Sequence, residues 1–144
     1  MAYQEYSDAV TELGEDEAWQ LLAGVPIGRL ATTIGDDIEV FPVNHVVDDG
    51  TVVFRTAQGS KLFELTVNSR VAFEADAYDE VGGWSVVVHG EAQVLQDPAE
   101  IEQAEQLPLR PWVATLKTTY VRIRPHRVSA RRFRFGEEPE GWHL

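Results

Sequence analysis

The residues with the clearest chemical potential lie in one short segment, residues 54–62, which reads FRTAQGSKL. Two cations and two hydroxyl groups surround its glycine: Arg55, Lys61, Thr56 and Ser60. If a strand ends at Thr56 and a helix begins at Ser60, then backbone N–H groups, hydroxyls and an ammonium group converge at one point, where a phosphate can bind. A plain turn whose lysine faces water is the alternative. The segment is not the GxxxxGK[ST] loop of nucleoside triphosphatases, because its first glycine is missing and its serine precedes its lysine.

Positive charge is scarce in the rest of the chain. The formal net charge is −12, with 12 Lys and Arg against 24 Asp and Glu. This balance argues against general binding to nucleic acid or to an anionic membrane, because such binding depends on Lys and Arg at phosphate groups. A second basic segment, YVRIRPHRVSARRFRF, carries arginines from Arg122 to Arg134. These arginines either pair with acidic neighbours on the outside of a strand pair, or form a site for a cofactor phosphate or a substrate carboxylate.

The sequence lacks the residues that several other kinds of catalytic or metal site require. The chain has no cysteine, which excludes disulfides, thiol catalysis and thiolate metal sites. A Gly-x-Ser-x-Gly sequence is also missing, so a catalytic serine elbow is not expected. No histidine stands at ligand spacing from another, so no metal site is expected. The four histidines are His45, His89, His126 and His143. His45 and His89 are expected to be strand residues with ordinary hydrogen bonds, although either could line a pocket.

Length and composition indicate one domain over residues 1–144, with an N-terminal extension over 1–14 and a C-terminal tail over 136–144. The hydrophobic fraction of 44% is ordinary for a soluble globular protein. No apolar run approaches the roughly 18 residues that a membrane-spanning helix needs, and the N-terminus has no apolar signal core. A cytoplasmic protein with neither a nucleic-acid nor a membrane partner is therefore expected.

The elements that must position these residues are mostly short strands. Helices are expected over residues 15–24, 60–69 and 97–106, and strands over 28–34, 38–47, 51–56, 70–76, 84–95, 117–125 and 127–135. The clearest turn is Asp48-Asp49-Gly50, since Asp-Gly tolerates the positive φ angles of a tight hairpin. Ser60 is the expected cap of the second helix, and the strand over 84–95 is expected to be the longest. Mostly β structure with short helices and regularly spaced strands favours a small barrel over a sheet of βαβ units.

Three stretches share an order and spacing that are more specific than any one motif. They read AWQLLAGVPIGRLAT, VFPVNHVVDDGTVVFRTAQGSKLFELTVNSRVAFEADAYDE and GWSVVVHGEAQVL. Together they resemble the pyridoxamine 5′-phosphate oxidase-like flavin-binding family, in its branch of small actinobacterial-type proteins. The resemblance covers residues 18–135, nearly the whole chain. It implies a six-stranded split β-barrel that forms a homodimer, with FMN bound at the dimer interface.

The resemblance also implies which residues hold the flavin. Three would lie along the isoalloxazine ring and offer it backbone hydrogen bonds: Pro42, Val43 and Asn44. Three match the positions that hold the flavin phosphate: Thr56, Ser60 and Lys61. One matches a position that contacts the ring or the phosphate: Arg55. Trp84 and Ser85 match a strand that approaches the flavin, and Trp112 would contact the flavin from the other subunit. No residue is assigned a catalytic role.

A bound flavin would supply hydride or electron chemistry, while the protein positions the ring and excludes competing reactions. The resemblance therefore predicts an FMN-dependent oxidoreductase that acts on a small organic molecule. Two alternatives stay open: a deazaflavin-dependent reductase of the same fold, and a flavin-binding or sensor protein without turnover. The stretch DEVGGWSVVVHGEAQVL resembles the deazaflavin group too, whereas the intact Thr-x-x-Gly-Ser-Lys segment favours FMN. The C-terminal RFRFGEEPEGWHL does not match the substrate-binding Arg and His set of true pyridoxamine phosphate oxidases, which argues against vitamin B6 as the substrate.

Overall fold

The structure is a computed structural model that describes residues 9–57, 60–66, 70–109 and 119–137. The elements within these ranges follow in the order β1 (Val10–Leu13), α2 (Glu15–Ala23), β2 (Ile27–Ile34), β3 (Asp37–Asp48), β4 (Thr51–Thr56), α3 (Lys61–Thr66), β5 (Arg70–Tyr78), β6 (Gly82–Val94), α4 (Pro98–Glu105) and β7 (Thr119–Arg134). Of the helices in the described ranges, none has the length and apolar character that crossing a bilayer requires.

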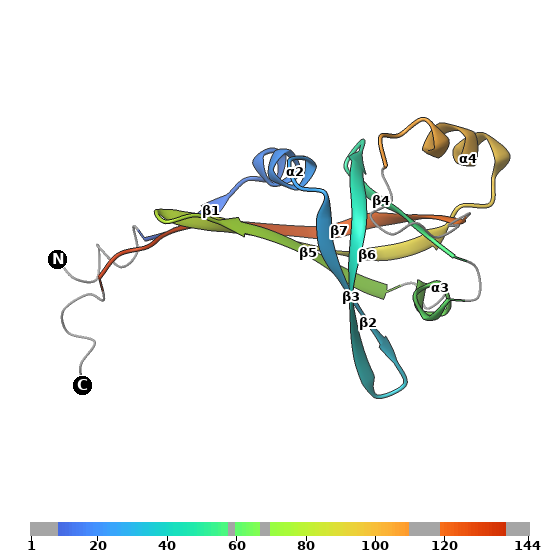
Figure 1. Cartoon of the computed structure of the whole chain (residues 1–144), viewed down its shortest axis with the longest axis horizontal. Coiled ribbons are helices and arrows are strands. Elements are labelled where there is room, and N and C mark those ends of the chain that lie inside the picture. Colours follow the sequence, from blue (N-terminus) through green and yellow to red (C-terminus); the bar gives the residue numbers. More distant parts are fainter. Residues whose placement is uncertain (1–8, 58–59, 67–69, 110–118, 138–144) are drawn as a thin grey trace.

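Strands β2 to β7 close into an antiparallel barrel. The strand order is β1-β7-β4-β3-β2-β5-β6, and a further pairing between β6 and β7 closes the sheet on itself. In Figure 1 the β2–β3 hairpin projects from the barrel on the side opposite α2, while α3 and α4 lie apart from each other at the end of the molecule away from β1. The architecture confirms the expected fold class, which is mostly β with short helices and a six-stranded split barrel.

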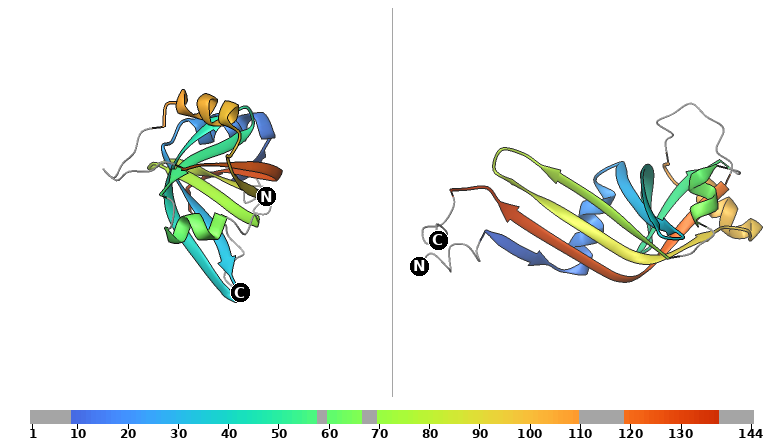
Figure 2. Two further views of the ribbon diagram at one scale, coloured as in Figure 1. Left: turned by 90° about the vertical axis from the view of Figure 1, so that its right-hand side faces the viewer. Right: turned by 90° about the horizontal axis from the view of Figure 1, so that it is seen from below.

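An arm extends from the barrel at the end opposite α4. It consists of the ends of β5, β6 and β7, and of the short strand β1 (Figures 1 and 2). In β1, Val10 pairs with Phe133 and Leu13 with Ala130. This strand falls in the stretch that was expected to be an N-terminal extension, and sequence analysis did not predict it. Its residues are mostly exposed, so backbone pairing with β7 holds it in place. The sequence therefore lacks the alternation of apolar and polar residues that would predict a strand here.

The hairpin between β3 and β4 forms at the expected turn. Asp48 pairs with Thr51, and the two residues between them have positive φ angles, 48° for Asp49 and 66° for Gly50. Both angles lie in the left-handed region, which Asp and Gly adopt at low cost. Local turn chemistry therefore sets this hairpin.

The last strand differs from the expectation. Residues 117–125 and 127–135 were predicted as a pair of strands, but β7 is one strand of 16 residues, and it exceeds the 13 residues of β6 that was expected to be longest. A proline in mid-strand suggested a break, because proline cannot donate a ladder hydrogen bond. Pro125 instead lies at a β-bulge, where the register between β6 and β7 shifts next to Gly90. A bulge interrupts the ladder locally, so the strand passes through the proline without losing a required donor.

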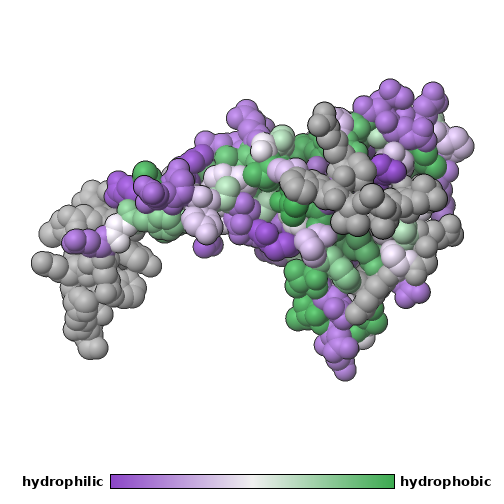
Figure 3. Space-filling view, in the orientation of Figure 1, coloured by the Kyte–Doolittle hydropathy of each residue, from purple (hydrophilic) through white to green (hydrophobic). Residues whose placement is uncertain are grey.

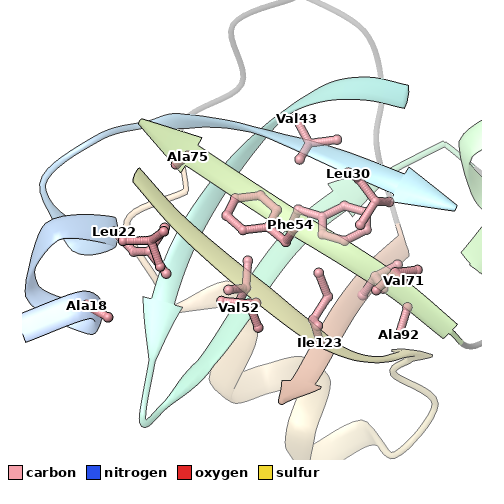
Figure 4. Close-up of a cluster of buried hydrophobic side chains, with 14 of the residues drawn as sticks. Ala18, Leu22, Leu30, Val43, Val52, Phe54, Val71, Ala75, Ala92 and Ile123 are labelled. Atoms are coloured by element: carbon pink, nitrogen blue, oxygen red, sulfur yellow. The ribbon is translucent and has the colours of Figure 1, made fainter. Parts of the chain in front are cut away.

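The core fills the barrel and continues under α2. Figure 4 shows Phe54, Leu30 and Val52 inside the barrel, with Leu22 of α2 at one end. Gly28 is required beside this core, since a Cβ there would lie 2.2 Å from Cζ of the buried Phe73. The barrel is thus packed from within, and ligand sites must lie on its outer face or at its openings.

Candidate functional site

The segment between β4 and α3 brings two hydroxyl groups together. Oγ1 of Thr56, the last residue of β4, lies 3.0 Å from Oγ of Ser60. Ser60 Oγ also accepts a hydrogen bond of 3.1 Å from the backbone N–H of Phe63, so Ser60 caps α3 as predicted. Lys61 is the first residue of that helix. The expected junction of a strand end, a capped helix start and neighbouring hydroxyl groups is present.

Strands β3 and β4 separate beside this junction. Their ladder ends at the pair His45 and Phe54, although both strands continue beyond it. The segment Pro42–Asn44 directly precedes the last paired residue of β3, and Arg55 directly follows that of β4. We call this opening the split. It has the predicted ring-binding residues on one side and the predicted phosphate-binding residues on the other.

The side chains at the split point in different directions. Val43 is buried in the core, whereas Pro42 is exposed, so a ligand outside the barrel could contact Val43 only through its backbone. On the other strand, Cζ of Arg55 lies 5.6 Å from the ring centre of its cross-strand neighbour Tyr120. An arginine at this distance from an aromatic ring makes a cation–π contact. That contact sets the position of one cation beside the split.

Two of the predicted flavin contacts lie far from the Arg55 side of the split in the same chain. Trp84 and Ser85 belong to β6 in the arm, where Trp84 pairs with Arg132 of β7. Arg55 pairs with Tyr120 on the same strand. At about 3.3 Å per residue these two positions of β7 are about 40 Å apart along the strand. A single chain therefore keeps Trp84 and Ser85 away from Arg55. On the other side of the split, the register across β3, β2, β5 and β6 places Ser85 about 16 Å from Pro42.

The arm has cavities of its own. One, of about 390 Å³, is lined by residues that include Tyr78, Trp84 and Arg132. Another, of about 380 Å³, is lined by residues that include Ser85 and Phe133. The remaining predicted contact, Trp112, lies outside the described residues.

A charged network that the sequence analysis missed lies between these two regions. Nε of Arg29 donates a hydrogen bond of 2.7 Å to Glu74, and its Nη2 lies 2.9 Å from Oδ1 of Asp76. In the strand register Arg29 pairs with Pro42, and Asp76 pairs with Ser85. Burial raises the pKa of Glu74 and its hydrogen bond to Asp76 raises it further, whereas that same hydrogen bond lowers the pKa of Asp76. Alternation along β5 places both carboxylates on one face, but only the register between strands shows that they share Arg29.

His45 connects helix α2 to the barrel. Its Nε2 lies 2.9 Å from the carbonyl oxygen of Leu22, so this nitrogen carries the proton and donates it. Its backbone N–H donates to the carbonyl of Pro26 at 3.0 Å, and its ring packs edge-on against Phe73. Burial lowers the pKa of His45. The prediction of a strand residue with ordinary hydrogen bonds is confirmed for His45.

The basic C-terminal segment divides into two groups. Three of its arginines contact acidic residues: Arg122 with Asp48 at 3.0 Å, Arg124 with Glu100 at 3.8 Å and Arg132 with Glu17 at 4.0 Å. For these three the expectation of arginines paired with acidic neighbours is confirmed. Arg127 instead lines a cavity together with His89.

Comparison with known proteins agrees with this architecture. The family model for pyridoxamine 5′-phosphate oxidase matches residues 14–132. Protein Rv3129 of Mycobacterium tuberculosis is 48% identical over 95 residues, which cover 66% of this chain and 86% of that protein. A Corynebacterium glutamicum structure, whose name proposes a pyridoxamine 5′-phosphate oxidase, has a TM-score of 0.83 at 43% identity and covers 90% of this chain and 97% of its own. A Mycobacterium smegmatis structure named as an FAD binding protein has a TM-score of 0.80 at 42% identity and covers 87% of this chain and 99% of its own.

The match to the family model spans the barrel and both sides of the split. The chain belongs to the pyridoxamine 5′-phosphate oxidase family, as the resemblance of its sequence indicated.

Proposed function

We propose that this chain binds a flavin at the split and uses it for hydride or electron transfer with a small organic substrate. The observation that carries the proposal is the junction at Thr56 and Ser60, where a strand end, a capped helix start and two hydroxyl groups meet beside the separated strands β3 and β4. The family of the chain and the M. smegmatis relative named for FAD binding support the same function.

The residues at the split fit a flavin phosphate by charge and by hydrogen-bonding capacity. Thr56 and Ser60 supply hydroxyl donors, and Arg55 and Lys61 supply positive charge in a chain that is otherwise strongly acidic. The ring would lie along Pro42–Asn44, where the buried side chain of Val43 leaves the backbone as the contact. A bound flavin supplies the redox chemistry, and these residues bind it, orient it and exclude water from it.

The identity of the flavin is tested by equilibrium titration of the purified apoprotein with FMN, FAD and a deazaflavin cofactor. We expect FMN to bind, because the Thr-x-x-Gly-Ser-Lys segment suits a short ribityl phosphate. FAD belongs in the same experiment, since the M. smegmatis relative is named for it. Tighter deazaflavin binding would favour the reductase alternative. If none of the three cofactors binds, the proposed function is wrong.

Two observations support a homodimer in which the arm of one copy reaches the split of the other. The first is the distance of Trp84 and Ser85 from Arg55 in a single chain. The second is an exposed apolar surface on the β2–β3 hairpin, visible in Figure 3, which is formed by Ile38 and Val40. Exposed apolar patches of this kind mark interaction surfaces.

The dimer is tested by sedimentation of an Ile38→Asp variant. We expect this variant to sediment as a monomer and to bind flavin more weakly, because a charge in the hairpin surface opposes burial against a second copy. Ala99→Asp, on the exposed first turn of α4, is the matched control and should remain dimeric. A wild-type chain that is monomeric and still binds flavin at full affinity would contradict the arrangement.

Turnover distinguishes an enzyme from a flavin-binding or sensor protein. The reduced, flavin-loaded protein is mixed with oxygen, quinones or nitro compounds, and its reoxidation is followed by absorbance. Reoxidation faster than that of free flavin with one acceptor class supports an oxidoreductase and names its substrate class. Reoxidation no faster than free flavin with every acceptor supports the binding protein instead.

A further inference from the structure

A cavity of about 430 Å³ on the outside of the barrel has a strongly basic lining. Four basic side chains line it: Arg70, His89, His126 and Arg127. Its remaining described lining residues are neutral, and they include Ala31, Thr33, Ile38 and Ala72. No acidic side chain is among the described residues of this lining. We call this cavity the basic pocket.

The strand register builds the floor of the basic pocket. Ala31 of β2 pairs with Ala72 of β5, Ala72 pairs with His89 of β6, and His89 pairs with Arg127 of β7. Neighbouring strands are about 4.8 Å apart, so this row crosses about 14 Å of the sheet. The two alanines have short side chains, and they leave space beside the imidazole and the guanidinium group.

A β-bulge brings His126 and Arg127 into the same pocket. Successive residues of a strand normally point to opposite faces. Here His89 pairs with Arg127 but Gly90 pairs with Pro125, so His126 is the extra residue of the bulge. Bulges re-aim side chains in this way, and they are frequent beside functional sites. The β-bulge at Pro125, which led the sequence analysis to divide β7 into two strands, therefore places two basic side chains on the same face.

Within the described part of the chain, the two arginines of the pocket have no acidic partner. Among the described residues, none forms an ion pair with Arg70 or Arg127, in contrast to Arg122, Arg124 and Arg132 in the same barrel. Arg70 stands opposite the exposed Glu91 in the register of β5 and β6, yet no ion pair joins them. The chain has twice as many acidic as basic residues, so this absence of partners is a property of the pocket and not of the composition.

Like charges also crowd one another in the pocket. Burial lowers the pKa of His89, and the neighbouring Arg127 and His126 lower it further. An anion bound among these groups would offset this repulsion and favour the charged form of His89, and the two arginines attract anions from solution.

We propose that the basic pocket binds a small organic anion that carries a phosphate or carboxylate group, at a site separate from the flavin phosphate. Arginine forks and protonated imidazoles are the usual partners of both groups. The volume lies within the range of about 300–1,000 Å³ that small-molecule pockets occupy. Ala31 and Ala72 in the floor of the pocket offer an apolar contact for the organic part.

The test follows the imidazole C2–H signals of the histidines by proton NMR while pyrophosphate or citrate is added at constant ionic strength. We expect a saturable rise in the pKa of His89, because a bound anion stabilises its charged form, a saturable shift of the His126 signal, and no change at the buried His45. Arg127→Gln should weaken binding by about tenfold or more, since a charge-assisted hydrogen bond is lost. Arg127→Lys keeps the positive charge but loses the two-pronged guanidinium group, so its anion affinity should lie between those of the wild type and Arg127→Gln. Arg131→Gln is the matched control, because Arg131 is exposed on the same strand outside the pocket.

Three outcomes would overturn the proposal. Shifts that do not saturate, or equal losses in Arg127→Gln and Arg131→Gln, would show only general screening of charge. Displacement of pyrophosphate by saturating FMN would make the pocket part of the flavin site. Histidine signals that respond to dissociation of a dimer but not to either anion would mean that a second copy covers the pocket.

Discussion

Thr56 and Ser60 hold each other's side chains in place, with Oγ1 and Oγ 3.0 Å apart. The pair has two hydroxyl protons, and only one of them lies between the two oxygens. Ser60 Oγ additionally accepts the N–H of Phe63, which orients it at the start of α3. The second proton of the pair therefore remains available to donate to a ligand oxygen. The proposed flavin phosphate would accept this proton.

Replacing Ser60 and Lys61 together by alanine should weaken FMN binding by about 3 kcal/mol, or somewhat over a hundredfold. The reason is the loss of one hydroxyl donor and one cation from a charge-assisted phosphate site. Fluorescence titration of the variant measures the effect. Riboflavin is the internal control, because it has the same ring but no phosphate, and its affinity should not change.

The double variant also removes the cap of α3, so a control for helix destabilisation is needed. Asp97→Ala removes the corresponding cap of α4, where Oδ1 accepts the N–H of Ala99 at 3.0 Å. It should cost about 1 kcal/mol of folding stability and leave FMN affinity intact. Equal losses of affinity for FMN and riboflavin in the double variant would place the phosphate elsewhere.

Gly28→Ala should destabilise the barrel by about 1–3 kcal/mol, because core overpacking forces strained side-chain or backbone shifts. The new Cβ would lie 2.2 Å from Cζ of Phe73 and 2.8 Å from the carbonyl oxygen of Glu74, and the phenyl ring is fully buried. Chemical denaturation measures the change. Gly24→Ala is the control, since its Cβ would come no closer than 3.5 Å to another residue and should change stability by less than about 0.5 kcal/mol. Similar losses in both variants would contradict the packing argument.

His45 should make folding stability fall in mild acid. Burial lowers its pKa in the folded protein below the ordinary value of 6.5, so on acidification the unfolded chain takes up the proton first. The contribution is complete above about pH 6.5 and is lost as the pH falls from there toward the folded pKa, at up to about 1.4 kcal/mol per pH unit. His45→Gln can still donate to the carbonyl of Leu22 but does not titrate, so it should flatten this slope. Denaturation at several pH values compares it with His126→Gln, an exposed position. An unchanged slope in His45→Gln would mean that other groups cause the acid sensitivity.

Features that depend on neighbouring residues in the sequence could be predicted. The Asp-Gly hairpin, the cap at Ser60 and the helix that begins after Asp97 each follow from chemistry within a few residues, and all three are present. The split barrel came from the resemblance of longer stretches. The segment FRTAQGSKL was predicted to bind a phosphate because its residue types are rare elsewhere in this acidic chain.

Features that depend on register could not be predicted. β1 is held by a partner strand more than a hundred residues away and buries little of its own surface. The bulge at Pro125 exists only relative to β6, so the proline appeared to end a strand. The network of Arg29, Glu74 and Asp76 likewise requires knowing which strands are neighbours. In each case the sequence contains the residues but not the alignment that brings them together.

Arg122→Gln should destabilise the protein by about 3 kcal/mol, because it leaves a partly buried carboxylate without its cation. Nη1 of Arg122 lies 3.0 Å from Oδ2 of Asp48 and 2.7 Å from Oγ1 of Thr51, and only 9% of the arginine side chain is exposed. Arg124→Gln is the control: its side chain is 53% exposed and 3.8 Å from Glu100, so its loss should cost about 0.5 kcal/mol or less.

A double-mutant cycle separates the ion pair from other effects of losing Arg122. Asp48→Asn is the suitable partner change, because asparagine keeps the turn chemistry of the β3–β4 hairpin while removing the charge. In that background Arg122→Gln should cost at least about 1 kcal/mol less than in the wild type, as contacting residues in one network do. Additive losses in urea denaturation would instead mean that Arg122 acts through packing of its aliphatic stem, and that the hairpin does not depend on the charge of Asp48.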